Sequence, residues 1–402
     1  MIRKKLTLSY AKKYQKAKSK KQKSKILDEF IQLTNYNRSY ASWLLRFAGR
    51  KIRISTPKGP KLVLVADPNR KIKRKRKRIY DQKVLKPLRK IWAILDYPSS
   101  LRLKAMLPKI IPKLEKHGEI QLTETVRNKL LRISRATIDR LLAPERKRLA
   151  LKPKAKTKPG TLLKKDIPIR THADWKESEP GFVEMDLVSH DGGLAKGDHA
   201  WSLVVVDFCT QWTETAPLKN RAQKWAFEAL QKISRRMPFP LKGIDCDNDG
   251  AFINHHLLKW SQEKGIVFTR SRPYRKNDNC RVEQKNWTVA RRYFGYFRYD
   301  TEKALEVLKE LSEVLSLYTN FFQPSVKLIE KRRIGSKVKR IYEEPKTPYE
   351  RVLEHPAIPE KTKEELRRKY EELNPAELRR KILRLQKKLF ELATPVKGVE
   401  YE

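Results

Sequence analysis

Three acidic residues lie in sequence surroundings that suit a divalent-metal site. Asp186 lies inside the apolar run 182–188, which is typical of a buried β-strand. Asp247 follows a short apolar run and precedes polar residues, so we expect it at the end of a second strand. Glu283 follows a loop rich in Pro, Asn and Asp and lies near the start of a predicted helix. Two divalent ions about 4 Å apart need several carboxylates to hold them. These three residues would supply those carboxylates.

The spacing of these acids and the residues around them resemble a known family. Thirty-five residues separate Asp247 from Glu283, as in the family's Asp-35-Glu pattern. The motifs that carry the likeness are Asp247-Asn248, Phe252-Ile253-Asn254, Arg272-Pro273-Tyr274, Asn277-Asp278-Asn279 and Val282-Glu283. On these motifs the chain resembles the DDE transposases of the retroviral-integrase superfamily. It is similar in particular to bacterial insertion-sequence transposases with an integrase catalytic core.

The block around the second acid departs from the family in one place. The family has a glycine directly after its Asp-Asn pair, whereas this chain has Asp249 there and Gly250 one position later. Asp245 and Asp249 therefore stay open as alternatives to Asp247 for the second ligand.

The resemblance implies a multidomain α/β protein whose catalytic domain, residues 179–325, has a ribonuclease-H-like mixed sheet flanked by helices. It also implies that Asp186, Asp247 and Glu283 are the catalytic residues and hold two Mg²⁺ or Mn²⁺ ions per active site. One ion would activate water or a 3′-hydroxyl, and the other would stabilise the leaving 3′ oxygen. The pattern of apolar residues predicts strands at 182–189, 201–208, 212–218, 241–247 and 266–270, and helices at 221–237, 254–264, 281–298 and 301–320.

The charge of the chain is large and unevenly distributed. The formal net charge is +47 and the isoelectric point is near 10.2. Residues 1–170 carry 50 Lys and Arg against 11 Asp and Glu, whereas residues 171–402 carry 43 against 35. Such a field attracts polyanions, and binding driven by counterion release depends on salt. We therefore predict that the N-terminal part binds double-stranded DNA.

Two helical modules are predicted in this basic part. Residues 1–70 contain amphipathic helical segments separated by a break at 34–37, which is the form of a helix-turn-helix module. Residues 71–143 begin with a basic arm, where we expect phosphate contacts from Lys73, Arg74 and Arg76.

The second module fills the rest of 71–143 and is predicted to be wholly helical. Ser134 can cap its last helix, whose exposed face offers Arg135 and Arg140 to DNA. Residues 144–178 have a basic, proline-containing composition that predicts an extended linker.

Further DNA contacts are predicted beside the candidate acids. They lie in the loop before Glu283 and on the helix that carries it, and they are Tyr274, Arg275, Lys276, Lys285 and Asn286.

Residues 326–402 form a basic C-terminal segment followed by an amphipathic helix. The basic part includes Val338 and Tyr342, and its pattern leaves a small barrel and an extended arm equally open. The helix opens at Asn374-Pro375, a favourable cap, and carries leucines at steps of three and four. Docking on the protein's own surface and dimerisation are both compatible with that spacing.

Composition bounds the class of protein and its location. Three scattered cysteines do not form a disulfide framework. No apolar run is long enough for a membrane span, so no membrane partner is expected. These features predict a cytoplasmic, nucleoid-associated protein of a prokaryote.

Together these observations predict a transposase that binds the terminal repeats of a mobile element, cleaves the DNA ends and joins the 3′-hydroxyl ends to target DNA. Because two ends must be held together, a homo-oligomer is expected. Two alternatives remain: a catalytically inactive, domesticated DNA-binding protein, and a ribonuclease-H-like nuclease without strand transfer.

Overall fold

The computed structural model describes residues 2–55, 59–67, 79–149, 179–246, 251, 255–270 and 280–395. The chain forms two compact units, Met1–Ile79 and Tyr80–Glu402. Several predicted positions lie outside the described residues, and these are Lys73, Arg74, Arg76, Asp247, Tyr274, Arg275 and Lys276.

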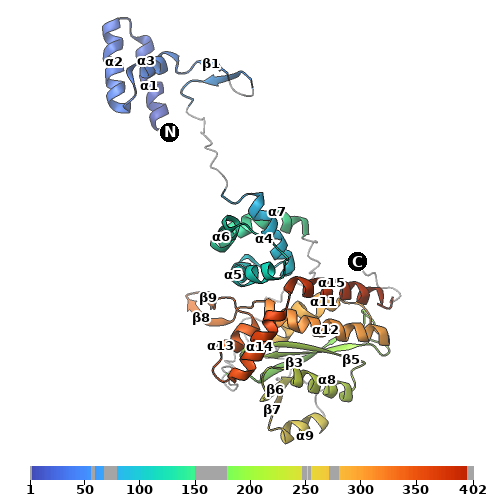
Figure 1. The fold of residues 1–402 in the computed structure, drawn as a ribbon. Helices are drawn as coiled ribbons and strands as arrows, with labels where there is room; N and C mark the ends of the chain where they lie inside the picture. Colours follow the sequence, from blue (N-terminus) through green and yellow to red (C-terminus); the bar gives the residue numbers. More distant parts are fainter. Residues whose placement is uncertain are drawn as a thin grey trace. The chain divides into compact units, whose positions relative to one another are not determined.

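The first unit contains three helices and a hairpin, drawn in blue in Figure 1. Helix α1 (Ile2–Lys16) packs against α2 (Lys20–Thr34) and α3 (Arg38–Phe47), and β1 (Lys51–Ile54) pairs antiparallel with β2 (Lys61–Leu64). The predicted break between two helices is confirmed, because Asn35 adopts a left-handed conformation with φ 57°. The Asn37 side chain then accepts a hydrogen bond from the Ser39 N–H at 2.9 Å and so begins α3.

The second unit begins with the predicted helical segment. It comprises α4 (Gln82–Ile94), α5 (Ser100–Lys116), α6 (Glu124–Arg132) and α7 (Arg135–Leu149). The predicted cap is confirmed, since Ser134 Oγ accepts a hydrogen bond from the Thr137 N–H at 3.2 Å and α7 begins at the next residue.

A five-stranded mixed sheet forms the centre of the second unit. Its strands are β3 (Phe182–Ser189), β4 (Trp201–Asp207), β5 (Thr213–Leu218), β6 (Gly243–Cys246) and β7 (Val267–Arg270), in the order β5-β4-β3-β6-β7. Strand β4 pairs antiparallel with β3 and with β5, whereas β6 pairs parallel with β3 and β7 pairs parallel with β6. All five strands were predicted from the sequence, and this arrangement fits a ribonuclease-H-like α/β core.

Helices cover the sheet on both sides. In Figure 1 the sheet lies between α12 (Glu302–Phe322) and α8 (Gln223–Arg236), and α9 (His255–Glu263) connects β6 to β7. A further helical run consists of α10 (Cys280–Lys285), the π-helical segment η2 (Asn286–Arg291) and α11 (Arg292–Phe294). It ends four residues before the predicted end at 298, because Gly295 turns the chain with φ 76°.

The turn after α4 attaches the helical segment to the sheet domain. Asp96 and Tyr97 have left-handed backbones, with φ 60° and 59°, which non-glycine residues rarely adopt. The Asp96 carboxylate is buried; it accepts a hydrogen bond from the Tyr293 hydroxyl at 2.8 Å and forms ion pairs with Arg292 and Arg379 at 2.7 Å each. These contacts fix a conformation that is otherwise unfavourable.

In the C-terminal segment the sequence left two points open: the fold of the basic part and the surface on which the amphipathic helix packs. Its first part is a hairpin, β8 (Leu328–Ile334) and β9 (Lys337–Tyr342), followed by α13 (Pro348–Glu354) and α14 (Glu360–Glu372). Helix α15 (Pro375–Glu391) begins at the predicted cap, where Asn374 Oδ1 accepts the Ala376 N–H at 3.0 Å. Its leucine face packs on α12 of the same unit, so the docked alternative is the one observed.

Candidate active site

Asp186 lies on the central strand of the sheet, on a polar stripe of one face. Along β3 the apolar side chains of Val183 and Met185 are completely buried, and the acidic residues Glu184 and Asp186 alternate with them. Asp186 is half-buried; its Oδ2 accepts a hydrogen bond from Asn286 Nδ2 at 2.6 Å, and its Oδ1 accepts from the Leu187 N–H at 2.8 Å. The acid is therefore held at the sheet surface against the start of η2.

Glu283 lies on α10, whose N-terminal end is tied to the same strand. The backbone N–H groups of Arg281 and Val282 donate to Glu184 Oε2 at 3.1 and 2.8 Å. A carboxylate at this end of a helix satisfies backbone donors and interacts favourably with the helix dipole. Glu283 itself is exposed. Glu184 and Asp186 thus fix two successive turns of the helical run that presents Glu283.

Glu184 was not predicted as a site residue, although its spacing from Asp186 could have indicated it. It stands two residues before Asp186, and strand periodicity places residues i and i+2 on one face. Burial raises the pKa of Glu184 to about 7, against the effect of the N–H donors and of Arg281, whose guanidinium lies 3.7 Å away. The Arg281 guanidinium also stacks over the Phe208 ring at 4.6 Å.

The second predicted acid, Asp247, directly follows the described end of β6. Strand β6 pairs with β3 so that Asp245 lies opposite Glu184. Asp245 is buried, and its Oδ1 accepts a hydrogen bond from Thr269 Oγ1 of β7 at 2.8 Å. The Asp245 carboxylate therefore has a partner within the sheet, whereas Asp247 and Asp249 lie outside the described residues.

Comparison with known proteins identifies the family. The family model "Integrase core domain" matches residues 176–276, a range that includes Asp186 and Asp247 and ends seven residues before Glu283. The uncharacterized protein y4rM of Sinorhizobium fredii is 37% identical over 329 residues, which cover 82% of this chain and 89% of that protein. The chain belongs to the integrase/transposase superfamily.

Among solved structures, the catalytic core domain of BIV integrase matches 42% of this chain and 91% of its own, with 16% identity and a TM-score of 0.27. A TM-score this low does not establish a shared fold, and the family assignment rests on the two sequence matches. An integrase core indicates a polynucleotidyl transferase, and such domains bind DNA and generally use divalent metals.

The donor set of this integrase core fits hard divalent cations. Asp186 and Glu283 offer carboxylate oxygens, which Mg²⁺ prefers, and the amide of Asn286 orients the first of them. Within the described ranges, no group of three or more His, Cys, Asp or Glu side chains is arranged to hold a metal ion. The predicted third ligand, Asp247, is not part of those ranges.

Lys285 and Asn286, predicted as DNA contacts, lie in different surroundings. Asn286 is half-buried and donates to Asp186, so it acts within the acidic site of the integrase core. Lys285 is half-buried; burial, together with the neighbouring guanidinium groups of Arg102 on α5 and Arg351 on α13, lowers its pKa to about 8.

The predicted contacts on α7 lie at the surface. Arg135 is exposed, and Arg140 is exposed with its guanidinium donating to the Thr137 hydroxyl at 3.0 Å. Both are therefore accessible to a nucleic acid. No helix of the described chain is long and apolar enough to cross a membrane.

Proposed function

We propose that the chain is a DDE transposase that binds the terminal repeats of a mobile element, cleaves the DNA ends and joins the 3′-hydroxyl ends to target DNA. One observation carries the proposal: the helix that presents Glu283 is fastened across β3 beside Asp186, through Glu184 and Asn286. A family match alone would not require such a connection between the first and third predicted acids.

In this mechanism Asp186, Asp247 and Glu283 would together hold two divalent ions. Bound there, the ions would supply Lewis-acid activation of the attacking water or 3′-hydroxyl and charge stabilisation of the leaving oxygen. Asn286 keeps the Asp186 carboxylate oriented, and Glu184 holds the first turn of α10, the helix that carries Glu283.

DNA recognition is assigned to the N-terminal modules. The proposal gives α1 to α3 and α4 to α7 the reading of terminal repeats, with Arg135 and Arg140 on the exposed side of α7. The basic arm with Lys73, Arg74 and Arg76 would contact phosphates between the modules. A homo-oligomer would hold the two ends together.

The test uses labelled duplexes from the DNA that flanks the gene, a supercoiled target plasmid and purified full-length protein in Mg²⁺ or Mn²⁺. Wild type is compared with Glu283→Gln and Asp247→Asn. Glu306→Gln, which removes one exposed carboxylate from α12, serves as the matched control. We expect cleaved ends and joined products from wild type and from the control, and neither product from the two site variants.

Three other outcomes would contradict the proposal in different ways. Salt-sensitive binding without cleavage by wild type in either metal would indicate a DNA-binding relic. Cleavage without joined products would indicate a nuclease. Full activity of Asp247→Asn would indicate that Asp245 or Asp249, rather than Asp247, is the second metal ligand.

A further inference from the structure

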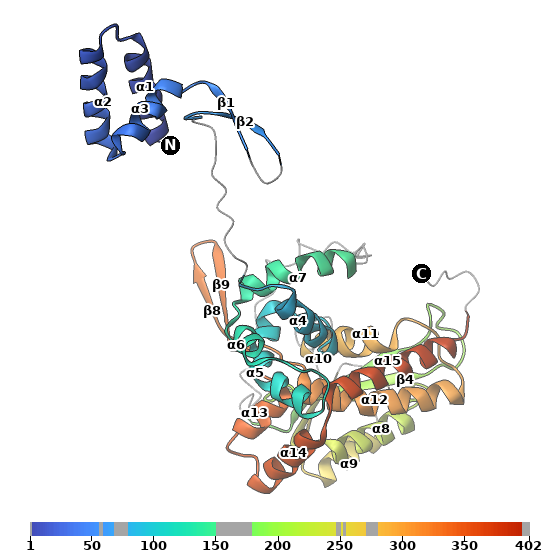
Figure 2. The ribbon, with the colours of Figure 1, turned by 45° about the horizontal axis from the view of Figure 1, so that its top comes forward.

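The β8–β9 hairpin, Leu328–Tyr342, projects from the second unit with both of its faces exposed over residues 332–340. Every residue from 332 to 340 is exposed, although side chains alternate between the two faces of a strand. Figure 2 shows the hairpin standing out from the body of that unit. A two-stranded hairpin in water is marginally stable at best. An isolated ribbon of this kind is therefore expected to meet a partner.

The charge of the hairpin indicates what that partner is. Residues 328–342 contain six Lys and Arg and one Glu. Arg332 lies directly opposite Lys339 in the strand pairing, and like charges at opposed positions destabilise a hairpin. The single acid, Glu330, is paired with Arg332. One acid leaves most of the positive charge of the hairpin uncompensated, and a polyanion would offset it.

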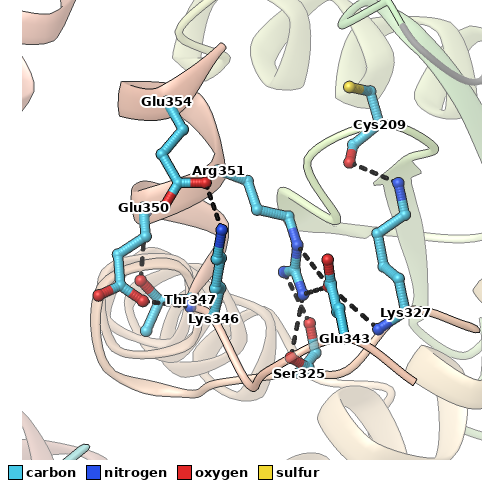
Figure 3. A network of polar contacts seen from close by, with 9 residues as sticks. All are labelled: Cys209, Ser325, Lys327, Glu343, Lys346, Thr347, Glu350, Arg351 and Glu354. Atoms are coloured by element: carbon cyan, nitrogen blue, oxygen red, sulfur yellow. Dashed lines mark hydrogen bonds and ion pairs between the residues drawn. The ribbon is translucent and has the colours of Figure 1, made fainter. Parts of the chain in front are cut away.

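The base of the hairpin, in contrast, is firmly fixed. Figure 3 shows the buried Arg351 guanidinium of α13 bound to Glu343 at 2.5 Å and to the hydroxyl and carbonyl of Ser325 at 2.9 Å each. Lys327 donates its N–H to Glu343 at 3.1 Å and its Nζ to the Cys209 carbonyl at 3.0 Å. Both strands thus leave a rigid support, which places the exposed part in a defined position.

We propose that the β8–β9 hairpin is a separate DNA-binding element that inserts into a groove of duplex DNA. The inference rests on the proposed function, because it adds a DNA contact to a DNA-joining enzyme. The major groove admits a two-stranded ribbon. The seven residues of β8 span about 23 Å at a rise of about 3.3 Å per residue, enough to cross it.

The tip of the hairpin suits a groove better than a protein surface. Ile334 and Val338 are 64% and 51% exposed and lie beside the turn at Gly335, where they can contact base edges such as thymine methyl groups. Basic residues flank them and would reach the phosphates on both sides of the groove. A second copy of the hairpin is a poor partner, because both copies carry the same large positive charge.

The test measures binding of the full-length protein to a labelled 30-base-pair duplex over a range of KCl concentrations. The hairpin variant is Lys337→Gln, Lys339→Gln and Arg340→Gln, three exposed side chains without an acidic partner in the described chain. The control removes the same charge from exposed positions of α14 through Lys361→Gln, Arg368→Gln and Lys369→Gln. Five glutamates on α14 make that helix a poor site for DNA.

We expect the hairpin variant to bind about tenfold or more weakly at about 0.1 M salt, and the slope of log K against log salt to fall by about 1 for each lost phosphate contact. The α14 control should bind within about twofold of wild type. Thermal unfolding should be the same in all three proteins, because the substituted side chains are exposed.

If the hairpin variant binds DNA with the affinity of wild type and with the same slope of log K against log salt, the hairpin proposal is overturned and the proposed function stays intact. If wild type itself fails to bind duplex DNA, the proposed function fails. Sedimentation provides the third outcome: an oligomer lost only in the hairpin variant, with unchanged DNA affinity, would assign the hairpin to self-association and also overturn the proposal.

Discussion

The two ends of the helical run Cys280–Phe294 are held in different ways. At the first end, Glu184 of β3 accepts hydrogen bonds from two backbone N–H groups, and Asp186 accepts one from the side-chain amide of Asn286. Glu283 remains exposed. At the other end, Arg292 and Tyr293 bind the buried carboxylate of Asp96, together with Arg379. At the first end the candidate acid Glu283 is exposed to solvent. At the second end the buried acid Asp96 is paired with two arginines, and this cluster joins two parts of the unit. Within fifteen residues, the run thus has one end that carries an exposed candidate acid and another end that stabilises the unit.

The largest difference should appear when Asp186 is replaced by Asn. We expect end cleavage to fall at least about a thousandfold, because the proposed metal ligand is lost, while the free energy of unfolding changes by less than about 1 kcal/mol. Cleavage assays and urea denaturation measure the two quantities. A large loss of stability in Asp186→Asn would show that the end of the run at β3 also stabilises the unit, as the end at Asp96 does.

Replacing Asp96 by Ala should give the opposite result. It leaves Arg292 and Arg379 without their shared carboxylate, and breaking a buried ion pair costs about 3–5 kcal/mol. Urea denaturation of this variant is compared with Asp198→Ala, a matched change at an exposed position, which should cost less than about 0.5 kcal/mol. Equal effects of the two changes would show that the Asp96 cluster does not stabilise the unit.

Glu184 tests whether the first end also needs its support. In Glu184→Ala, two backbone N–H groups of α10 lose their acceptor, so we expect a loss of about 2 kcal/mol in stability and about tenfold in end cleavage. Glu184→Gln keeps an oxygen acceptor and should retain most of the activity. If the two variants are equally inactive, the charge of Glu184 matters rather than its capping of the helix.

His190, which packs on Phe294 at the second end of the run, should give a smaller effect on stability that depends on pH. Its ring is buried, packs on Phe294 with ring centroids 5.6 Å apart, and shares a hydrogen bond of 2.8 Å with the Ser202 hydroxyl. Burial lowers the pKa of His190 from 6.5 to about 3, so the unfolded chain takes up this proton first as the pH falls. Stability from His190 is complete above about pH 6.5 and is lost progressively towards pH 3.

We therefore expect wild type to lose up to about 1.4 kcal/mol more per pH unit than His190→Gln between about pH 6 and 4. Urea denaturation at several pH values measures this difference. Parallel curves for the two proteins would mean that His190 is not kept neutral by burial.

The sequence predicted those parts of the molecule that are encoded locally. Apolar alternation and helix caps located β3, the cap at Ser134 and the start of α15, and strand context placed Asp186 on the central strand. Glu184 was missed because its role depends on backbone groups nearly a hundred residues away, and Asp96 because its partners Tyr293 and Arg379 are more distant still. Such contacts leave no periodic signal in the chain.

The fold of 326–342 could not be decided from the sequence for a different reason. A strand is recognised by alternation between apolar and polar residues, which arises when one face is buried. Neither face of β8 or β9 is buried over 332–340, so basic residues occur on both. The pattern was absent because its physical cause is absent.

The π-helical segment η2 sets the angular phase between the two ends of the run. An α-helix advances about 100° per residue, and a π-helical turn accommodates an extra residue within a helix. Restoring a regular α-helix over Asn286–Arg291 without removing a residue would rotate the α10 end by about 100° relative to Arg292. Either the contacts of α10 with Glu184 or the ion pair of Arg292 with Asp96 would then be lost. Deleting one residue together with that change would restore the original phase, so the π-helical segment allows the run to carry one extra residue while both of its ends keep their partners.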